Sequence, residues 1–135
     1  PLVCYVMLNP SHATDKASDN TMTRAAKAAA MMGFGGMIIV NLFAIRSENP
    51  AIIRDHPNPV GPDNDEQIQA AVSEAGAVFA AWGETGSTTY RERAKTVVNL
   101  VESDLYVLKL TKAGHPHHPA RLSYDDISPV PYTIE

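Results

Sequence analysis

The sequence begins with a short apolar run at residues 2–8 that stops abruptly at Asn9-Pro10-Ser11. A run of this length, closed by a proline turn, is typical of a buried strand in a parallel sheet. Pro10 has no N–H to donate to a neighbouring strand, so the strand must stop there and the chain must leave the sheet. In an open α/β sheet, ligands bind at the loops that leave the carboxyl ends of the strands. We therefore expect this loop to belong to a binding site.

Three more apolar runs follow, and segments with helical patterning separate them. We expect strands at residues 2–8, 37–42, 77–82 and 105–110, and helices at residues 19–32, 63–75 and 88–102. Regular alternation of strand and helix predicts right-handed crossovers and a sheet that is covered on both faces. The fold class is therefore α/β, a three-layer sandwich with a central four-stranded parallel sheet.

Local signals mark the ends of these elements. Asp19 is a good N-cap for the first helix, and Thr88 or Thr89 for the last. Gly33 and Gly76 are good stop residues for the first and second helices. A short helical turn is expected at residues 49–54, and the segment 111–135, rich in proline and histidine, is expected to form a loop and an extended tail.

Length and composition describe an ordinary globular chain. The 135 residues predict a single domain, 1–135, and no apolar run reaches the roughly 20 residues of a membrane span. The lone cysteine, Cys4, is expected to be a small buried hydrophobe and suits a reducing cytoplasm. The net charge of −4 gives no general attraction to nucleic acid or to an anionic membrane, although basic residues could still gather locally.

With parallel strands, the residues that close each strand lie at one edge of the sheet. The polar and aromatic residues placed there are Asn9, Pro10, Ser11, Asn41, Phe43, Trp82, Gly83, Glu84, His115, His117 and His118. An asparagine amide both donates and accepts hydrogen bonds, which suits an amide-like or base-like ligand, and histidine can act as donor, acid or base. Phe43 and Trp82 could provide a wall on which a base stacks.

Each of these residues also has a purely structural interpretation. Asn9 could form a turn with its own loop, Asn41 could bond to the backbone, and the histidines could lie in a solvated loop. Trp82 could belong mainly to the core.

Other chemistries receive weaker support from the sequence. A metal could bind where the histidines meet Asp15 and Asp19, but no cysteine pair accompanies them. A nucleophilic pair of Ser11 and His118 lacks the Gly-x-Ser-x-Gly elbow. Phosphate-loop and dinucleotide fingerprints are absent, so no cofactor is expected.

Several strings together resemble a known family. MLNPS, GGMIIVNLFAIRS, NPVGPDND, AAWG and LTKAGHPHHPARLS, in this order, resemble the bacterial and phage family catalogued as domain of unknown function 1643. Members usually carry Asp-Asp-Pro-Thr where this chain has Ser18-Asp19-Asn20-Thr21, and an N-terminal Arg- and Tyr-rich segment that we expect to be missing here. The resemblance implies no settled activity.

A more distant resemblance implies one. Asn9-Pro10-Ser11, Asn41 and the segment His118-Pro119-Ala120-Arg121-Leu122-Ser123 are similar to motifs of the uracil-DNA glycosylase superfamily. The resemblance implies catalytic roles for Asn9, Ser11 and His118, and substrate-binding roles for Pro10, Asn41, Phe43, Trp82, Gly83 and Arg121. Asn41 would read a flipped base, Asn9 would position water, His118 would stabilise the departing base anion, and Arg121 and Lys112 would contact phosphate. The first loop lacks the carboxylate that would activate water.

The leading hypothesis is a domain that recognises a nucleobase, in nucleic acid or in a nucleotide, and hydrolyses an N-glycosidic bond. The first alternative is a non-catalytic module that binds nucleotides or modified DNA. The second is a hydrolase of a small molecule, with or without a metal. None of these functions involves a membrane.

Overall fold

We describe the protein from a computed structural model, which covers residues 1–10, 16–47, 49 and 51–134. Five strands form one sheet in the order β2-β1-β3-β4-β5. They are β1 (Leu2–Met7), β2 (Gly36–Asn41), β3 (Ala77–Ala80), β4 (Leu105–Val107) and β5 (Val130–Pro131). The first four strands run parallel, as expected, so their carboxyl ends lie at one edge of the sheet.

The fifth strand corrects the predicted four-stranded parallel sheet. β5 pairs antiparallel with β4, which makes the sheet mixed. The predicted extended tail is drawn onto the sheet because Tyr132 is buried against Trp82, with ring centroids 6.1 Å apart, and its N–H donates to the Leu105 carbonyl at 2.8 Å. Pro131 is tolerated because β5 is an edge strand, where a missing N–H costs no pairing on the open side.

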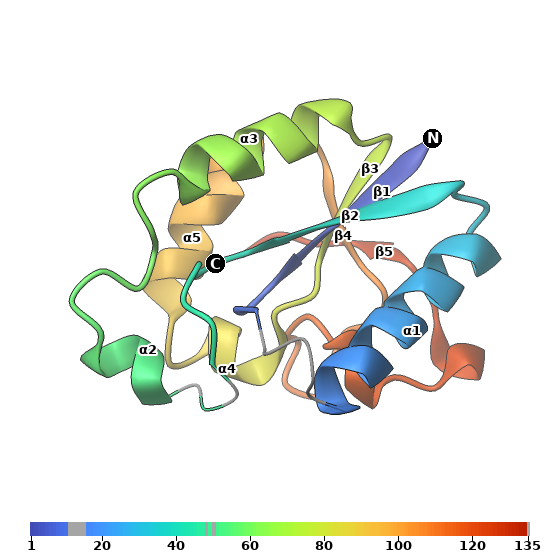
Figure 1. The fold of residues 1–135 in the computed structure, drawn as a ribbon. Coiled ribbons are helices and arrows are strands. Elements are labelled where there is room, and N and C mark those ends of the chain that lie inside the picture. Colours follow the sequence, from blue (N-terminus) through green and yellow to red (C-terminus); the bar gives the residue numbers. More distant parts are fainter. Residues whose placement is uncertain (11–15, 48, 50, 135) are drawn as a thin grey trace.

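Both faces of the sheet are covered, as the alternation of elements predicts (Figure 1). Along β1, Val3, Tyr5 and Met7 belong to one apolar cluster, while Cys4 and Val6 belong to the other. Helix α1 (Lys16–Met31) packs its alanines onto the first face, and α3 (Asn64–Glu74) and α5 (Arg91–Leu100) cover the second. This period of two is what strand geometry requires of a sheet between two helical layers.

Cys4 is fully buried, and burial raises the pKa of its thiol to about 11. The thiol therefore stays protonated near neutral pH, as expected for a packing residue.

The helices begin at other residues than the capping signals suggest. α1 begins at Lys16, so Asp19 lies in its first turn and does not cap it. The segment after β3 forms α4 (Gly83–Ser87), and α5 is capped by Tyr90 and not by Thr88 or Thr89. The Thr88 hydroxyl donates instead to the Glu84 carbonyl at 2.8 Å, which helps to close α4.

The remaining helical elements are short. α2 (Ala51–Asp55) matches the expected turn, and two 3₁₀ turns, η1 (Pro119–Arg121) and η2 (Tyr124–Asp126), replace part of the expected loop after β4.

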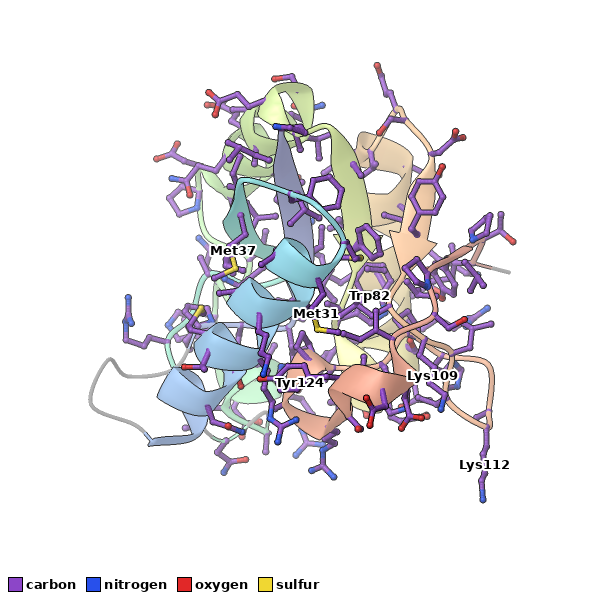
Figure 2. The ribbon with its side chains drawn as sticks, turned by 90° about the vertical axis from the view of Figure 1, so that its right-hand side faces the viewer. Met31, Met37, Trp82, Lys109, Lys112 and Tyr124 are labelled. Carbon is purple, nitrogen blue, oxygen red and sulfur yellow. The ribbon has the colours of Figure 1, made fainter. Side chains whose placement is uncertain are left out.

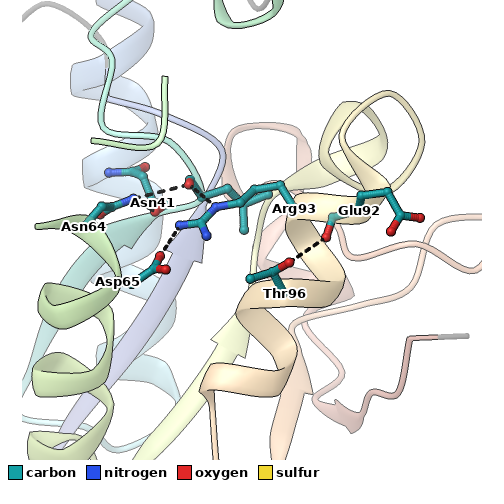
Figure 3. Close-up of polar contacts among 7 residues, drawn as sticks. Asn41, Asn64, Asp65, Glu92, Arg93 and Thr96 are labelled. Atoms are coloured by element: carbon teal, nitrogen blue, oxygen red, sulfur yellow. Dashed lines mark hydrogen bonds and ion pairs between the residues drawn. The ribbon is translucent and has the colours of Figure 1, made fainter. Parts of the chain in front are cut away.

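The end of β2 is clamped by side chains from α3 and α5 (Figure 3). Arg93 donates from Nε to the Leu42 carbonyl at 2.7 Å and from Nη2 to Asp65 at 2.7 Å. Asn64 donates from Nδ2 to the carbonyls of Asn41 and Leu42 at 3.0 and 3.2 Å. These contacts satisfy backbone carbonyls beyond the sheet ladder and fix the direction in which the chain leaves β2.

Candidate functional site

A cavity of about 910 Å³ opens at the carboxyl edge of the sheet. Its lining residues come from the loops after β1, β3 and β4, from α1 and from the segment after β2, and they are Leu8, Asn9, Thr21, Ser47, Trp82, Gly83, Glu84, Thr85, Thr111, Lys112, His117, His118, Ala120 and Arg121. The chain passes from β1 outward to β2 and then returns to β3 on the other side of β1, so the strand order changes direction between β1 and β3. Such a switch point is the usual ligand site of an open α/β sheet.

Asn9 ties two loops together at the floor of this cavity. Its Nδ2 group donates to the carbonyls of Ile45, Ser47 and Pro10 at 3.1, 2.8 and 3.3 Å. The Ser47 N–H returns a hydrogen bond to the Pro10 carbonyl at 2.9 Å. The amide therefore holds the loop after β1 against the loop after β2, and its carbonyl oxygen is the atom through which it can meet a ligand.

His118 presents a neutral imidazole to the cavity. Burial and the nearby Arg121 guanidinium lower the pKa of His118 from 6.5 to about 4. The N–H of Ala120 donates to Nδ1 at 3.2 Å, which makes His118 the N-cap of η1. Because Nδ1 accepts, the single proton of the neutral ring lies on Nε2, which is a hydrogen-bond donor.

Trp82 belongs mainly to the core and also borders the cavity. Its side chain is buried, and Nε1 donates to Ser87 Oγ at 3.0 Å. Gly86 lies so close that a Cβ there would come within 2.6 Å of the indole ring. Helix α4 thus fixes the indole ring in two ways: Ser87 accepts its hydrogen bond, and Gly86, which has no side chain, packs closely against it.

Gly83 begins α4 with a φ of +74°, a conformation that favours glycine. This turn directs the next residue, Glu84, to the cavity. The Glu84 carboxylate lies 3.6 Å from His115 Nε2. Among the described residues that line the cavity, Glu84 carries the carboxylate group.

A small hairpin after β4 forms the rim next to Glu84. Thr111 and His115 are joined by two hydrogen bonds, from the Thr111 N–H to the His115 carbonyl at 2.8 Å and from the His115 N–H to Thr111 Oγ1 at 3.1 Å. Lys112 lies at the exposed tip of this hairpin and extends into solvent (Figure 2). The rim therefore combines a close contact between a carboxylate and an imidazole with an exposed cationic side chain of long reach.

The structure brings together Asn9, Trp82, Gly83, His118 and Arg121 of the predicted site residues. It places Asn41, Phe43 and Pro10 outside the cavity lining. Phe43 is buried against Tyr90, with ring centroids 5.0 Å apart, and Asn41 ends β2, which is separated from the switch point by β1. Ser11 lies outside the described residues.

The structure does not test the alternative of a metal held by the histidines with Asp15 and Asp19, because the side chains of both aspartates lie outside its description. Among the side chains that it does describe, no three from His, Cys, Asp or Glu lie close enough to hold one ion.

Sequence reasoning missed the hydroxyl groups of the cavity. Thr21, Ser47, Thr85 and Thr111 line it, and nothing in their local sequence marks them. The strand order alone would have pointed to Thr85, because it follows β3, which borders the switch point.

Comparison with protein families supports the motif-based resemblance. The sequence profile of the family described as "Protein of unknown function (DUF1643)" matches residues 1–120. The chain belongs to this family. The DUF1643 match spans the cavity residues from Leu8 to Ala120 and stops before Arg121, η2 and β5.

Two further searches add nothing to the DUF1643 assignment, since neither the curated proteins nor the solved structures contain a significant match. Among the described helices of this DUF1643 protein, none combines the length and apolar character that a membrane span requires.

Proposed function

We propose that the cavity binds a nucleobase and that the protein hydrolyses the N-glycosidic bond between this base and its sugar. The observation that carries the proposal is the neutral His118 imidazole, a donor at Nε2, in the same cavity as the Asn9 amide. The similarity of the motifs around these residues to the uracil-DNA glycosylase superfamily also supports it. Similarity of this kind is an analogy, so the chemistry must be argued from the residues themselves.

His118 would stabilise the leaving base. When the bond from sugar C1′ to the base nitrogen breaks, its electron pair stays on the base, which becomes an anion. The Nε2–H group of His118 can donate a hydrogen bond to this anion, and preorganised donors of this kind act where charge develops. With a pKa of about 4, His118 is neutral at pH 7 and supplies a hydrogen bond and not a proton.

Glu84 would act as the general base that activates the attacking water. In the motif resemblance, the water-activating position of the first loop holds no carboxylate, but Glu84, which follows β3, lines the same cavity. As water attacks C1′, its oxygen forms the new bond and its proton passes to the Glu84 carboxylate. Asn9 Oδ1 can orient that water, because the three hydrogen bonds of Nδ2 hold the amide in place.

The remaining groups would bind the rest of the nucleotide. Trp82, the only tryptophan of the chain, is 2% exposed, so it supports the cavity from the core and reports on a bound base through its fluorescence. The cations Lys112 and Arg121 lie on the cavity rim, where a phosphate of the nucleotide could approach them.

A base-release assay tests this function. DNA that carries uracil, hypoxanthine or a modified pyrimidine, in single and double strands, is incubated with the protein, and free base is followed by mass spectrometry. We expect release by the wild-type protein and about a hundredfold slower release by His118→Asn. Asparagine keeps an acceptor for the Ala120 N–H but has no group at the position of Nε2, so the cap survives while the donor is lost.

A non-catalytic binding module is the second candidate. The observation in its favour is that the Asn9 amide is engaged by three backbone carbonyls, a structural role that needs no reaction. Quenching of Trp82 fluorescence by nucleotides, without release of base from any substrate, would favour the module. If neither the DNA substrates nor nucleotides quench Trp82 fluorescence or lose their base, both functions are wrong.

A further inference from the structure

A second, smaller hollow adjoins the cavity on the side of α1. Its volume is about 360 Å³, and it is lined by Arg24, Ala120, Arg121, Leu122, Ser123 and Tyr124. Ala120 and Arg121 also line the main cavity, so the two hollows meet at η1. Arg121 therefore lies at this junction.

Two cations of α1 are fixed at this hollow by one aromatic ring. The guanidinium carbon of Arg24 lies 5.5 Å from the centre of the Tyr124 ring, and Lys27 Nζ lies 4.3 Å from it. Arg24 also donates from Nη1 to the Leu122 carbonyl at 2.8 Å. Figure 2 shows Tyr124 beside α1, which agrees with these contacts. Cation–π contact and a backbone hydrogen bond hold the positive charges in place before any ligand arrives.

We call Arg24, Lys27 and Arg121 the cationic strip. Residues 20–31 of α1 contain Arg24 and Lys27 and no acidic residue, and a spacing of three places both on one helix face. The acids closest in sequence are Asp19, five residues before Arg24, and Asp125 and Asp126 of η2, of which Asp126 lies 3.9 Å from Lys109. Three cations therefore gather on this side of a chain whose net charge is −4.

We propose that the cationic strip binds the phosphodiester backbone of a nucleic acid whose target base enters the main cavity. This inference rests on the proposed function and names its substrate class: the substrate is a polynucleotide and not a free nucleoside or nucleotide. A mononucleotide reaches only the rim of the cavity, whereas a neighbouring phosphate of a polymer reaches Arg24 and Lys27. Preorganised cations lose little side-chain entropy on binding, which favours such a contact.

The experiment compares two ligands on the same variants. Binding of a fluorescein-labelled DNA oligonucleotide and of an RNA oligonucleotide is measured by anisotropy between about 50 and 200 mM salt. Binding of a deoxynucleoside monophosphate is measured by Trp82 fluorescence. The variants are Lys27→Gln, Arg24→Gln and the matched control Lys95→Gln, which removes one positive charge from α5 on the other side of the sheet.

We expect Lys27→Gln and Arg24→Gln to weaken oligonucleotide binding several-fold, and to lower the slope of log K against log salt by about one for each cation removed. Mononucleotide binding and the Lys95→Gln variant should stay at the wild-type level. Lys27→Gln is the variant that should disturb the fold less. Lys27 contacts only the Tyr124 ring among the contacts given above, whereas Arg24 also donates a hydrogen bond to the Leu122 carbonyl. Lys27→Arg should restore binding.

Other results overturn the inference in distinguishable ways. If the oligonucleotides bind no more tightly than the mononucleotide, or if Lys27→Gln and Lys95→Gln behave alike, the strip does not bind a backbone, and the proposed function stands on the cavity alone. If neither ligand binds at all, the proposed function and the inference fall together. If the oligonucleotides do bind through the strip, a preference for DNA or for RNA identifies the sugar that the substrate carries.

Discussion

Individual side chains at the cavity have a structural role, and the proposed function would give them a chemical one as well. His118 caps η1 through Nδ1 and offers Nε2 to the cavity. Trp82 packs on Tyr132 and forms a cavity wall. Asn9 binds a neighbouring loop and faces the same space. Because each residue anchors the fold, substitutions must be chosen so that the structural contact is preserved while the chemical one is removed.

The stability of the protein should report the depressed pKa of His118. A base whose pKa is lower in the folded chain takes up its proton more readily when unfolded, so the folded state loses stability as the pH falls from 6.5 toward 4. The loss is of the order of 3 kcal/mol and levels off below this range. Urea unfolding of the wild type and of His118→Asn, measured across this pH range, isolates the effect as the difference between the two curves. Parallel curves would show that His118 does not titrate in this way.

Gly86 should be intolerant of any side chain. A Cβ there would lie within 2.6 to 2.8 Å of the Trp82 side chain, closer than packed atoms allow. We expect Gly86→Ala to destabilise the fold by about 1–3 kcal/mol and to shift the Trp82 emission, because the indole must move. Gly35→Ala is the matched control, since its Cβ would lie 3.7 Å from the Pro1 carbonyl oxygen, an ordinary contact. Equal midpoints for the two variants in urea unfolding would contradict the close packing of α4 on Trp82.

Among the elements, α3 and α5 act together on the end of β2. Arg93 joins them through Asp65 and the Leu42 carbonyl, and its side chain is only 10% exposed. The contact fixes where the chain turns after β2, and this turn leads to Ser47 and the carbonyls that Asn9 binds. The clamp thus supports the cavity without touching it.

Replacing the two partners of the clamp should have unequal effects. Arg93→Ala removes two hydrogen bonds, although Asn64 still donates to the Leu42 carbonyl, so we expect a loss of about 1–3 kcal/mol. Asp65→Ala should cost about 1 kcal/mol or less, because the Asp65 side chain is 47% exposed and water screens the pair. Chemical denaturation measures both values. If Asp65→Ala proves as harmful as Arg93→Ala, the ion pair and not the carbonyl contact holds the clamp.

In the molecule as a whole, function-bearing groups concentrate where the strand order reverses. The cavity lies beside β1 and β3, and residues from segments far apart in sequence, such as Thr21 and His118, face each other across it. The cationic strip continues this surface onto α1. An acidic chain can thus present a basic path next to its cavity, because net charge limits only the average field and not its local sign.

Local pattern was enough to determine the strands, their parallel alignment and the loops that carry Asn9, Trp82 and His118. Apolar runs and proline stops are short-range signals, and a parallel sheet must gather its carboxyl ends at one edge. The position of Asn41 and Phe43 was beyond local pattern, because it depends on β2 lying outside β1, a matter of strand order. The fifth strand and the cationic strip were also beyond it. Both arise from contacts between segments that are distant in sequence, Tyr132 on Trp82 and Tyr124 on α1. These contacts can stabilise the protein only after folding has brought the segments together, so no local pattern in the sequence indicates them.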